Sequence, residues 1–224
     1  YHTALFGIQH EVHGRDIERL GFIERHPRRP QDGTAEDVAA VVAEWLARRS
    51  SGPVDRPFYA QVWFFETHTP FDYAGCDPDT ERGVEVPPYL ADDANARAAM
   101  AGYQGAIRRA DRAVGTILEA LAAAGLADDT LVVFTTDHGI EVPRAKWHLY
   151  DPGIGIACVV RWPGGGVVGG RACEALLGNV DYLPTVLDLA GLPAPGRAQG
   201  RSFAAALRGE TDAGREAVFA MYHK

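Results

Sequence analysis

Two adjacent side chains in the second half of the chain carry atoms that bind divalent cations. Asp137 and His138 follow the apolar run 131–136 and precede Gly139. A carboxylate oxygen beside an imidazole nitrogen suits Ca²⁺, Mn²⁺ or Zn²⁺, and oxygen-rich surroundings favour the harder ions. The same residues also fit an ordinary turn, because Asp near Gly is common there. Their position directly after a strand-like run favours a metal site.

Two further side chains have chemistry that suits an anionic substrate. His68 lies in the segment 66–71, and an imidazole can hydrogen-bond an oxyanion or protonate a leaving oxygen near neutral pH. Lys146 lies in the cationic and aromatic segment 143–150, where a cation beside a metal can neutralise sulfate or phosphate. The bland alternatives are a surface-loop histidine and a solvated lysine.

Strand-like runs alternate with helical periodicity along the chain, which predicts an α/β fold with a mostly parallel sheet. Strands are expected at 3–7, 58–65, 131–136 and 156–161, and a short one at 217–222. Helices are expected at 34–49, from residue 92 to the cap at Gly125, and at 181–189. Irregular connections are expected at 11–33 and 69–92.

The predicted sheet explains why these polar residues can act together. The continuous aromatic and β-branched run 58–65 is typical of a strand buried on both faces of a parallel sheet, and the run 156–161 is expected to be a further buried strand. Ligands bind at the carboxyl ends of such strands. His10, His68 and the pair Asp137 and His138 each follow a predicted strand, so we expect them at one sheet edge.

Composition excludes several classes of protein. The chain has 224 residues and a formal net charge of −8, which argues against a nucleic-acid or anionic-membrane binder. No apolar run approaches the ~20 residues of a membrane-spanning helix. The three cysteines are an odd number without metal-like spacing, so no disulfide scaffold or zinc cluster is predicted. The chain begins with Tyr1, and we expect it to start inside a domain.

In this order, the motifs resemble the sulfatase family of the alkaline-phosphatase-like superfamily. Similar segments are TALFGIQH at 3–10, RPFYAQVWFFETHTPF at 56–71, the long helix up to residue 126, DDTLVVFTTDHG at 128–139, VVRWPGG at 159–165, NVDYLPTVLDLAGLP at 179–193 and GRSF at 200–203. The run GIEVPRAKWHLYDPG at 139–153 looks nearest to the sulfamidase-like branch.

The resemblance implies hydrolysis of a sulfate ester or sulfamate. The family's nucleophile is a formylglycine hydrate bound to a calcium ion that polarises the sulfate. By analogy, Asp137 and His138 are metal ligands, His68 and Lys146 contact the sulfate and assist the leaving group, and His10 is the base that collapses the sulfated intermediate. The implied substrate is a small-molecule or saccharide sulfate.

Two departures from the family pattern bear on this assignment. The family has Lys where this chain has Ile8, so a cation expected near His10 is missing or supplied elsewhere. No CxPSR-type motif occurs, because Cys76 is followed by Asp, Pro, Asp and Thr. We therefore expect the formylglycine and the paired Asp ligands upstream, and we expect residues 1–224 to be one partial domain, incomplete at its N-terminus and inactive by itself.

Two alternatives stay open from the sequence. The first is a phosphatase or phosphodiesterase of the same superfamily, with a Ser or Thr nucleophile and two metals, although no DxxxH pair follows Asp137 and His138. The second is a non-catalytic relative that binds an anion, which Ile8 keeps plausible. The sequence predicts neither oligomeric state nor localisation.

Overall fold

The chain is represented by a computed structural model that describes residues 1–29, 33–50, 56–211 and 214–221. It forms two compact units, Tyr1–Leu126 and Ala127–Lys224. The expectation of one partial domain over 1–224 stays a prediction.

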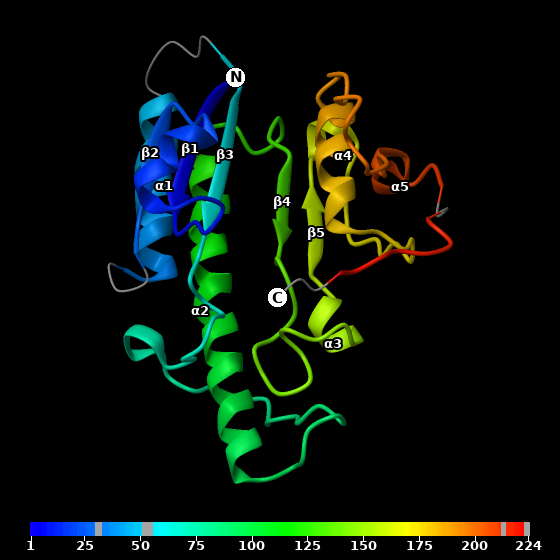
Figure 1. Ribbon diagram of the computed structural model, residues 1–224. Helices are drawn as coiled ribbons and strands as arrows, with labels where there is room; N and C mark the ends of the chain where they lie inside the picture. Colours follow the sequence, from blue (N-terminus) through cyan, green and yellow to red (C-terminus); the bar gives the residue numbers. More distant parts are fainter. Residues whose placement is uncertain (30–32, 51–55, 212–213, 222–224) are drawn as a thin grey trace. The chain divides into compact units, whose positions relative to one another are not determined.

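A parallel three-stranded sheet organises the first unit. Its strands are β1 (His2–Gly7), β2 (Glu24–Pro27) and β3 (Phe58–Trp63), in the order β2-β1-β3 (Figure 1). The predicted strands at 3–7 and 58–65 are confirmed, as is their parallel arrangement. The central strand β1 carries the deepest core residues of the sheet, since Ala4, Leu5 and Phe6 are all fully buried.

Strand β2 corrects the expectation that 11–33 is irregular, and a 3-10 helix, Gly14–Leu20, also lies in that segment. The sequence of β2 is polar, so it lacks the apolar alternation that predicts a strand. Contacts with other elements hold it instead. The His26 ring stacks on Phe6 at a centroid distance of 4.9 Å, and the Trp45 indole N–H donates to Glu24 Oε1 at 3.2 Å.

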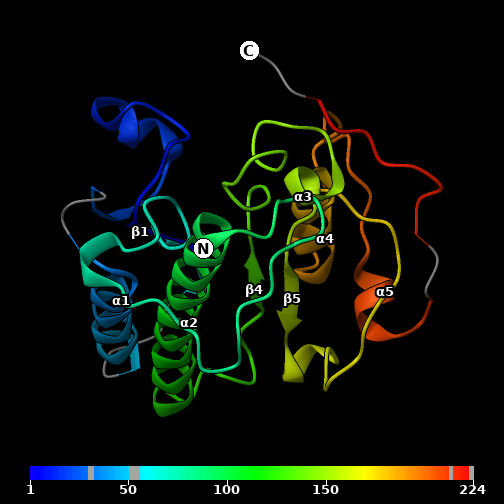
Figure 2. The same cartoon turned by 90° about the horizontal axis from the view of Figure 1, so that it is seen from below.

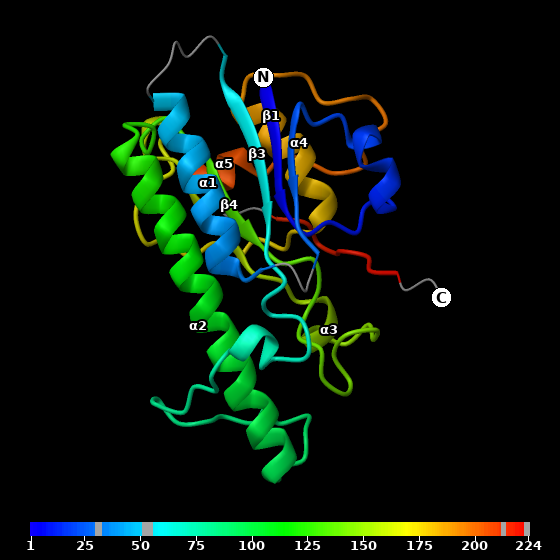
Figure 3. The same ribbon diagram turned by 90° about the vertical axis from the view of Figure 1, so that its left-hand side faces the viewer.

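Helices α1 (Ala35–Ser50) and α2 (Ala94–Ala123) pack against each other beside this sheet (Figure 3). The predicted capping box of α1 is present, because Asp37 N–H donates to Thr34 Oγ1 and Thr34 N–H donates to Asp37 Oδ2. Gly125 follows α2 with φ +70°, as expected of a helix-ending glycine. Small residues allow the helices to approach closely: Ala35, Ala39 and Ala113 form a fully buried cluster.

The end of β1 depends on a glycine. Gly7 has φ +79°, and a Cβ at this position would lie 2.0 Å from the carbonyl oxygen of Trp63 on β3. We expect Gly7→Ala to lower the free energy of unfolding by about 2 kcal/mol or more, because the left-handed backbone and the clash both oppose a side chain. Urea denaturation would measure the change.

A matched control for Gly7→Ala is available in the same unit. Gly14→Ala places a Cβ where no atom lies within 4 Å and where the backbone has no positive φ. It should change stability by less than about 0.5 kcal/mol. Equal stability of the two variants would contradict the role of Gly7 in ending β1.

The second unit contains an antiparallel pair, β4 (Val132–Thr135) and β5 (Cys158–Arg161). Figure 2 shows α4 (Tyr182–Leu189) and then α5 (Ala204–Arg208) beyond β5 on the side away from β4. A short helix, α3 (Asp151–Ile154), precedes β5. The predicted strand at 131–136 and helix at 181–189 are confirmed.

Three expectations about strands are wrong. The strand expected at 156–161 is present as β5, but it is mostly exposed rather than buried, with Val159 63% exposed, and it pairs antiparallel with β4. Strand β3 is only half-buried rather than covered on both faces. Residues 217–221 form no strand, and their apolar side chains are exposed; Tyr222 lies outside the described residues. In the described ranges, no helix is both long and apolar enough to cross a bilayer.

Candidate functional site

Asp137 and His138 lie two and three residues beyond the end of β4. Asp137 Oδ2 and His138 Nε2 are 3.5 Å apart, with 65% and 40% of the two side chains exposed. The other carboxylate oxygen, Oδ1, accepts a hydrogen bond from the His138 N–H at 3.0 Å. The two side chains therefore converge on one accessible point, and their role as metal ligands stays a prediction.

The histidine is oriented so that one particular nitrogen faces the carboxylate. His138 Nδ1 lies 2.7 Å from the carbonyl oxygen of Gly139, which can only accept, so the proton of the neutral ring is on Nδ1. This leaves Nε2 as the nitrogen with a lone pair, and a backbone carbonyl commonly fixes a metal-binding histidine in this way. One cation can bridge two donors 3.5 Å apart, because Ca²⁺ ligands lie about 2.3–2.6 Å from the ion.

The pair is a partial donor set. Over the part of the chain that the structure describes, no group of three or more His, Cys, Asp and Glu side chains could hold a metal ion. Calcium takes about 6–8 oxygen ligands. Asp137 and His138 therefore offer two donor atoms, fewer than a complete calcium site needs.

Groups from distant parts of the second unit hold the end of β4 in place. Asn179 Nδ2 donates to the Asp137 carbonyl oxygen at 3.2 Å, and the Thr135 and Tyr182 hydroxyls are 2.8 Å apart. Burial raises the pKa of Tyr182 to about 12, so this hydroxyl stays neutral. Sequence reasoning missed Asn179 and Tyr182 as supports, because 42 and 47 residues separate them from their partners.

Lys146 lies in the same unit as the candidate metal pair, but its ammonium group has an acidic partner. Its Nζ donates to Glu141 Oε2 at 3.0 Å, and its side chain is only 12% exposed. Sequence reasoning missed Glu141, since no helical or strand spacing relates residues five apart in a loop. A bound anion would therefore share this ammonium with Glu141.

His10 and His68 lie in the first unit, beyond the carboxyl ends of β1 and β3. These strands are parallel neighbours, and their last residues, Gly7 and Trp63, are partners in the register. Both histidines therefore follow the same edge of the sheet. His68 Nδ1 lies 2.6 Å from the carbonyl oxygen of Thr69, so the neutral ring carries its proton on Nδ1, and the ring stacks on Phe65.

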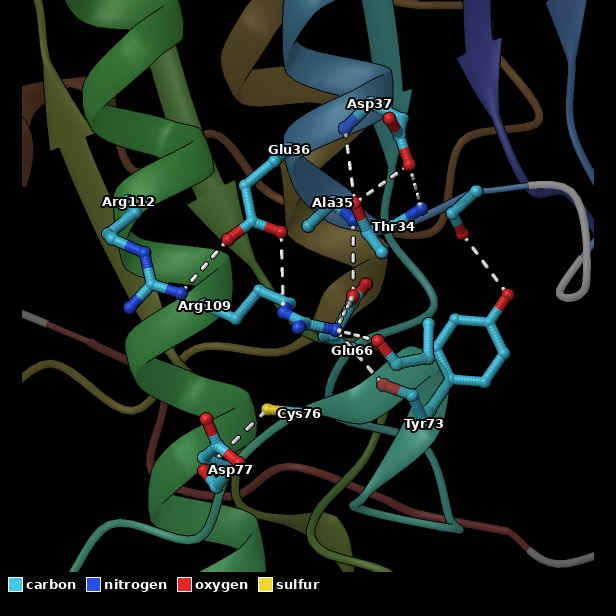
Figure 4. A network of polar contacts seen from close by, with 12 residues as sticks. Thr34, Ala35, Glu36, Asp37, Glu66, Tyr73, Cys76, Asp77, Arg109 and Arg112 are labelled. Atoms are coloured by element: carbon cyan, nitrogen blue, oxygen red, sulfur yellow. Dashed lines mark hydrogen bonds and ion pairs between the residues drawn. The ribbon is translucent and has the colours of Figure 1, made fainter.

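Buried Glu66 anchors the segment that leads to His68 (Figure 4). Its side chain is 2% exposed, and its Oε1 accepts the Ala35 N–H at the start of α1 and lies 3.8 Å from Arg109 Nη1 on α2. Arg109 also donates to the carbonyl oxygen of Tyr73. The two helices thus fix the chain on either side of His68. The sequence places Glu66 after a strand but gives no sign of these partners.

Cys76 lies beside the contacts of Glu66 and Arg109 and is a core residue (Figure 4). It is 5% exposed, and burial raises the pKa of its thiol. A buried thiol with a raised pKa is a poor nucleophile, because the thiolate is the reactive form. This agrees with the absence of the family's nucleophile motif around Cys76.

Comparison with known sequences identifies the segment that carries all of these residues except His10. A family model described as Sulfatase matches residues 14–192. Human N-sulphoglucosamine sulphohydrolase is 37% identical over 112 residues, which cover 50% of this chain and 22% of that protein. Steryl-sulfatase of Mus musculus is 30% identical over 205 residues, which cover 82% of this chain and 29% of that protein. The chain spans less than a third of either relative.

Solved structures share the fold. A Bacteroides thetaiotaomicron protein from work on the metabolism of multiple glycosaminoglycans superposes with a TM-score of 0.75 at 22% identity, covering 97% of this chain and 56% of that one. The phosphonate monoester hydrolase of Agrobacterium radiobacter superposes with a TM-score of 0.69 at 20% identity, covering 93% and 60%. At these identities the similarity concerns the fold.

Proposed function

Because the chain belongs to the sulfatase family and has its alkaline-phosphatase-like α/β fold, we propose that it is part of an enzyme that hydrolyses a sulfate ester or sulfamate. The observation that carries this proposal is the convergence of Asp137 Oδ2 and His138 Nε2 at the end of β4, inside the segment that matches the family. The chain spans only part of its relatives, so the activity is proposed for the full-length protein.

In this proposal, Asp137 and His138 hold one side of a divalent cation, most simply Ca²⁺. A bound cation would polarise the sulfate, and the family's formylglycine would supply the nucleophile. Asp137 contributes a charged oxygen, and His138 contributes the Nε2 lone pair that its hydrogen bond to the Gly139 carbonyl leaves available.

The remaining candidate residues are proposed to transfer protons and to stabilise negative charge on the sulfate. His68, with its Nδ1 proton held by the Thr69 carbonyl, can donate from Nε2 when the ring is protonated and so assist the departing oxygen or nitrogen. Lys146 is proposed to contact the sulfate, with Glu141 holding its ammonium group in place. His10 would act as a general base, accepting a proton at its imidazole during the hydrolysis.

The proposal is tested by comparing ester classes. We expect the full-length protein to hydrolyse a sulfate ester, to lose activity on chelation, to regain it with Ca²⁺, and to be inhibited by free sulfate more than by free phosphate. Preference for a phosphate monoester together with stronger inhibition by phosphate would support a phosphatase instead. Anion binding without hydrolysis of either ester would indicate a binding module.

Lys146 gives a prediction with a defined size. In the full-length protein, Lys146→Ala should lower kcat by about tenfold or more, because a cation on developing negative charge acts mainly in the transition state. Lys146→Met, which keeps the apolar stem of this largely buried side chain, should show the same loss. Unchanged steady-state kinetics of both variants would remove Lys146 from the site.

A further inference from the structure

The loop after the candidate metal pair carries aromatic and cationic side chains that the proposed chemistry does not use. Arg144, Trp147, His148 and Tyr150 are all exposed, and we call them the aromatic-cationic patch. Trp147 is 64% exposed and Tyr150 is 56% exposed. Large aromatic side chains are costly to leave in water, so an exposed pair beside a candidate active site indicates a binding surface.

The cations of the patch lie against its rings. The Arg144 guanidinium carbon is 5.9 Å from the centre of the Tyr150 ring, and the His148 and Tyr150 rings stack at 6.1 Å with an angle of 13°. In the ranges the structure describes, Arg144 makes no ion pair with a carboxylate. Its guanidinium is therefore held by a ring face while its N–H groups remain able to bind an anion.

The backbone of the loop holds these side chains in a fixed but unfavourable conformation. Arg144 has φ +66° and Trp147 has φ +72°, and positive φ is an outlier for bulky residues. Ala145, between them, is fully buried, and Lys146 N–H donates to the Ile140 carbonyl oxygen at 3.0 Å. Strain that the surrounding structure maintains is typical of binding and catalytic sites.

The same loop is tied to the candidate metal pair. Gly139, next to His138, donates its N–H to the Gly153 carbonyl oxygen at 3.0 Å. A Cβ on Gly153 would lie 2.3 Å from the carbonyl oxygens of both Ala145 and His148, so the two ends of the loop are in close contact. The patch is thus fixed relative to Asp137 and His138 within one unit.

We propose that the aromatic-cationic patch binds the sugar ring of an anionic saccharide whose sulfate is hydrolysed at the neighbouring site. This rests on the proposed function. Lys146 Nζ lies 5.7 Å from the centre of the Trp147 ring, so the opposite face of this exposed ring covers the apolar face of the sugar. Tyr150 holds Arg144, which pairs with a carboxylate or a second sulfate of the saccharide. A purely apolar substrate would cover Arg144 and His148 without giving them partners, which is unfavourable.

Selectivity between two sulfate esters tests this inference in the full-length protein. Trp147→Ala should reduce the ratio of kcat/KM for a sulfated, uronate-containing disaccharide to that for 4-nitrophenyl sulfate by about tenfold, mainly through the KM of the disaccharide. Leu149→Ala is the matched control, because Leu149 is 52% exposed in the same loop but has no aromatic face. It should leave the ratio unchanged.

A second variant separates binding from folding. Trp147→Gly removes the ring and also relieves the positive φ, so it should keep or raise the melting temperature, by up to about 4 °C, while weakening disaccharide binding as much as Trp147→Ala. Equal losses in the Leu149 and Trp147 variants, or equal losses on both esters, would overturn the saccharide assignment.

The experiments can distinguish failure of the saccharide-binding inference from failure of the proposed function. If the wild-type protein hydrolyses no sulfate ester, the proposed function fails, and calorimetric titration with the sulfated disaccharide still tests the patch. Weaker binding by Trp147→Ala than by wild type and Leu149→Ala would support the inference. The same affinity in all three proteins, or no binding by wild type, would overturn it.

Discussion

Replacing Asp137 with Ala should lower kcat/KM of the full-length protein on its sulfate ester by about 10³-fold or more. A metal ion that acts as a Lewis acid contributes several kcal/mol to the transition state, and about 4 kcal/mol corresponds to this factor. The carboxylate is 65% exposed, and its Oδ2 is 3.5 Å from His138 Nε2. Its loss should therefore remove a ligand while leaving the fold intact.

Metal binding gives the Asp137 prediction a readout that does not depend on activity. Ca²⁺ should raise the melting temperature of the wild-type protein, because a ligand stabilises the state that binds it, and this increase should shrink in Asp137→Ala. Asp129→Ala is the matched control, since Asp129 is an exposed carboxylate before the other end of β4. A variant at Asp137 with wild-type activity and an undiminished response to Ca²⁺ would contradict the metal assignment.

Replacing Asp181 with Ala should destabilise the second unit by about 3–5 kcal/mol, the cost of breaking a buried charge pair from one side. Asp181 is 1% exposed and accepts hydrogen bonds from the N–H groups of Gly178 at 3.0 Å and Arg201 at 2.7 Å. It also accepts two hydrogen bonds from the guanidinium of Arg215. Without the carboxylate, these donors lose their acceptor where little water can replace it.

Asp181 also makes stability depend on pH. Burial raises the pKa of its carboxyl, but hydrogen bonds from Arg215, Arg201 and Gly178 outweigh burial and hold the pKa below its ordinary value. The carboxyl therefore stabilises the folded state fully above the unfolded pKa of about 3.9, and this contribution is lost as the pH falls through the lower folded pKa. The difference between wild type and Asp181→Ala should be complete at neutral pH and shrink below about pH 4.

Urea denaturation at neutral and acid pH would measure both effects at Asp181. Asp188→Ala is the control, because Asp188 is an exposed carboxylate on α4, the helix that begins directly after Asp181. It should change the free energy of unfolding by less than about 1 kcal/mol at either pH. A loss at Asp181 no larger than at Asp188, or one that is independent of pH, would show that the buried carboxylate does not hold the unit together.

Local patterns in the sequence were sufficient to predict most of the helices and strands. The spacing of Val38, Val42 and Trp45 after the capping box at Thr34 predicts α1, and the apolar run before Trp63 predicts β3. The same logic predicts that Asp137 and His138 emerge from a strand end. These features were predictable because neighbouring residues determine capping, periodicity and the position of a strand end.

Other features depended on contacts between residues far apart in the chain. Strand β2 is polar, and only Phe6 and Trp45 from other elements explain why His26 and Glu24 lie in a sheet. The run 156–161 predicts a buried strand in a mostly parallel sheet, but β5 is exposed and pairs antiparallel with β4. Pairing direction depends on which strand is adjacent, and periodicity within a strand does not carry that information.

The sequence by itself determined the family, the order of the main helices and strands, and the residue types of the candidate site. Only the tertiary structure decided how those residues are supported: Lys146 by Glu141, the end of β4 by Asn179, and the His68 segment by Glu66 and Arg109. A side chain's chemical type is fixed by the sequence. Its orientation and charge environment depend on partners that folding brings together, in two of these pairs from more than about 40 residues away in the chain.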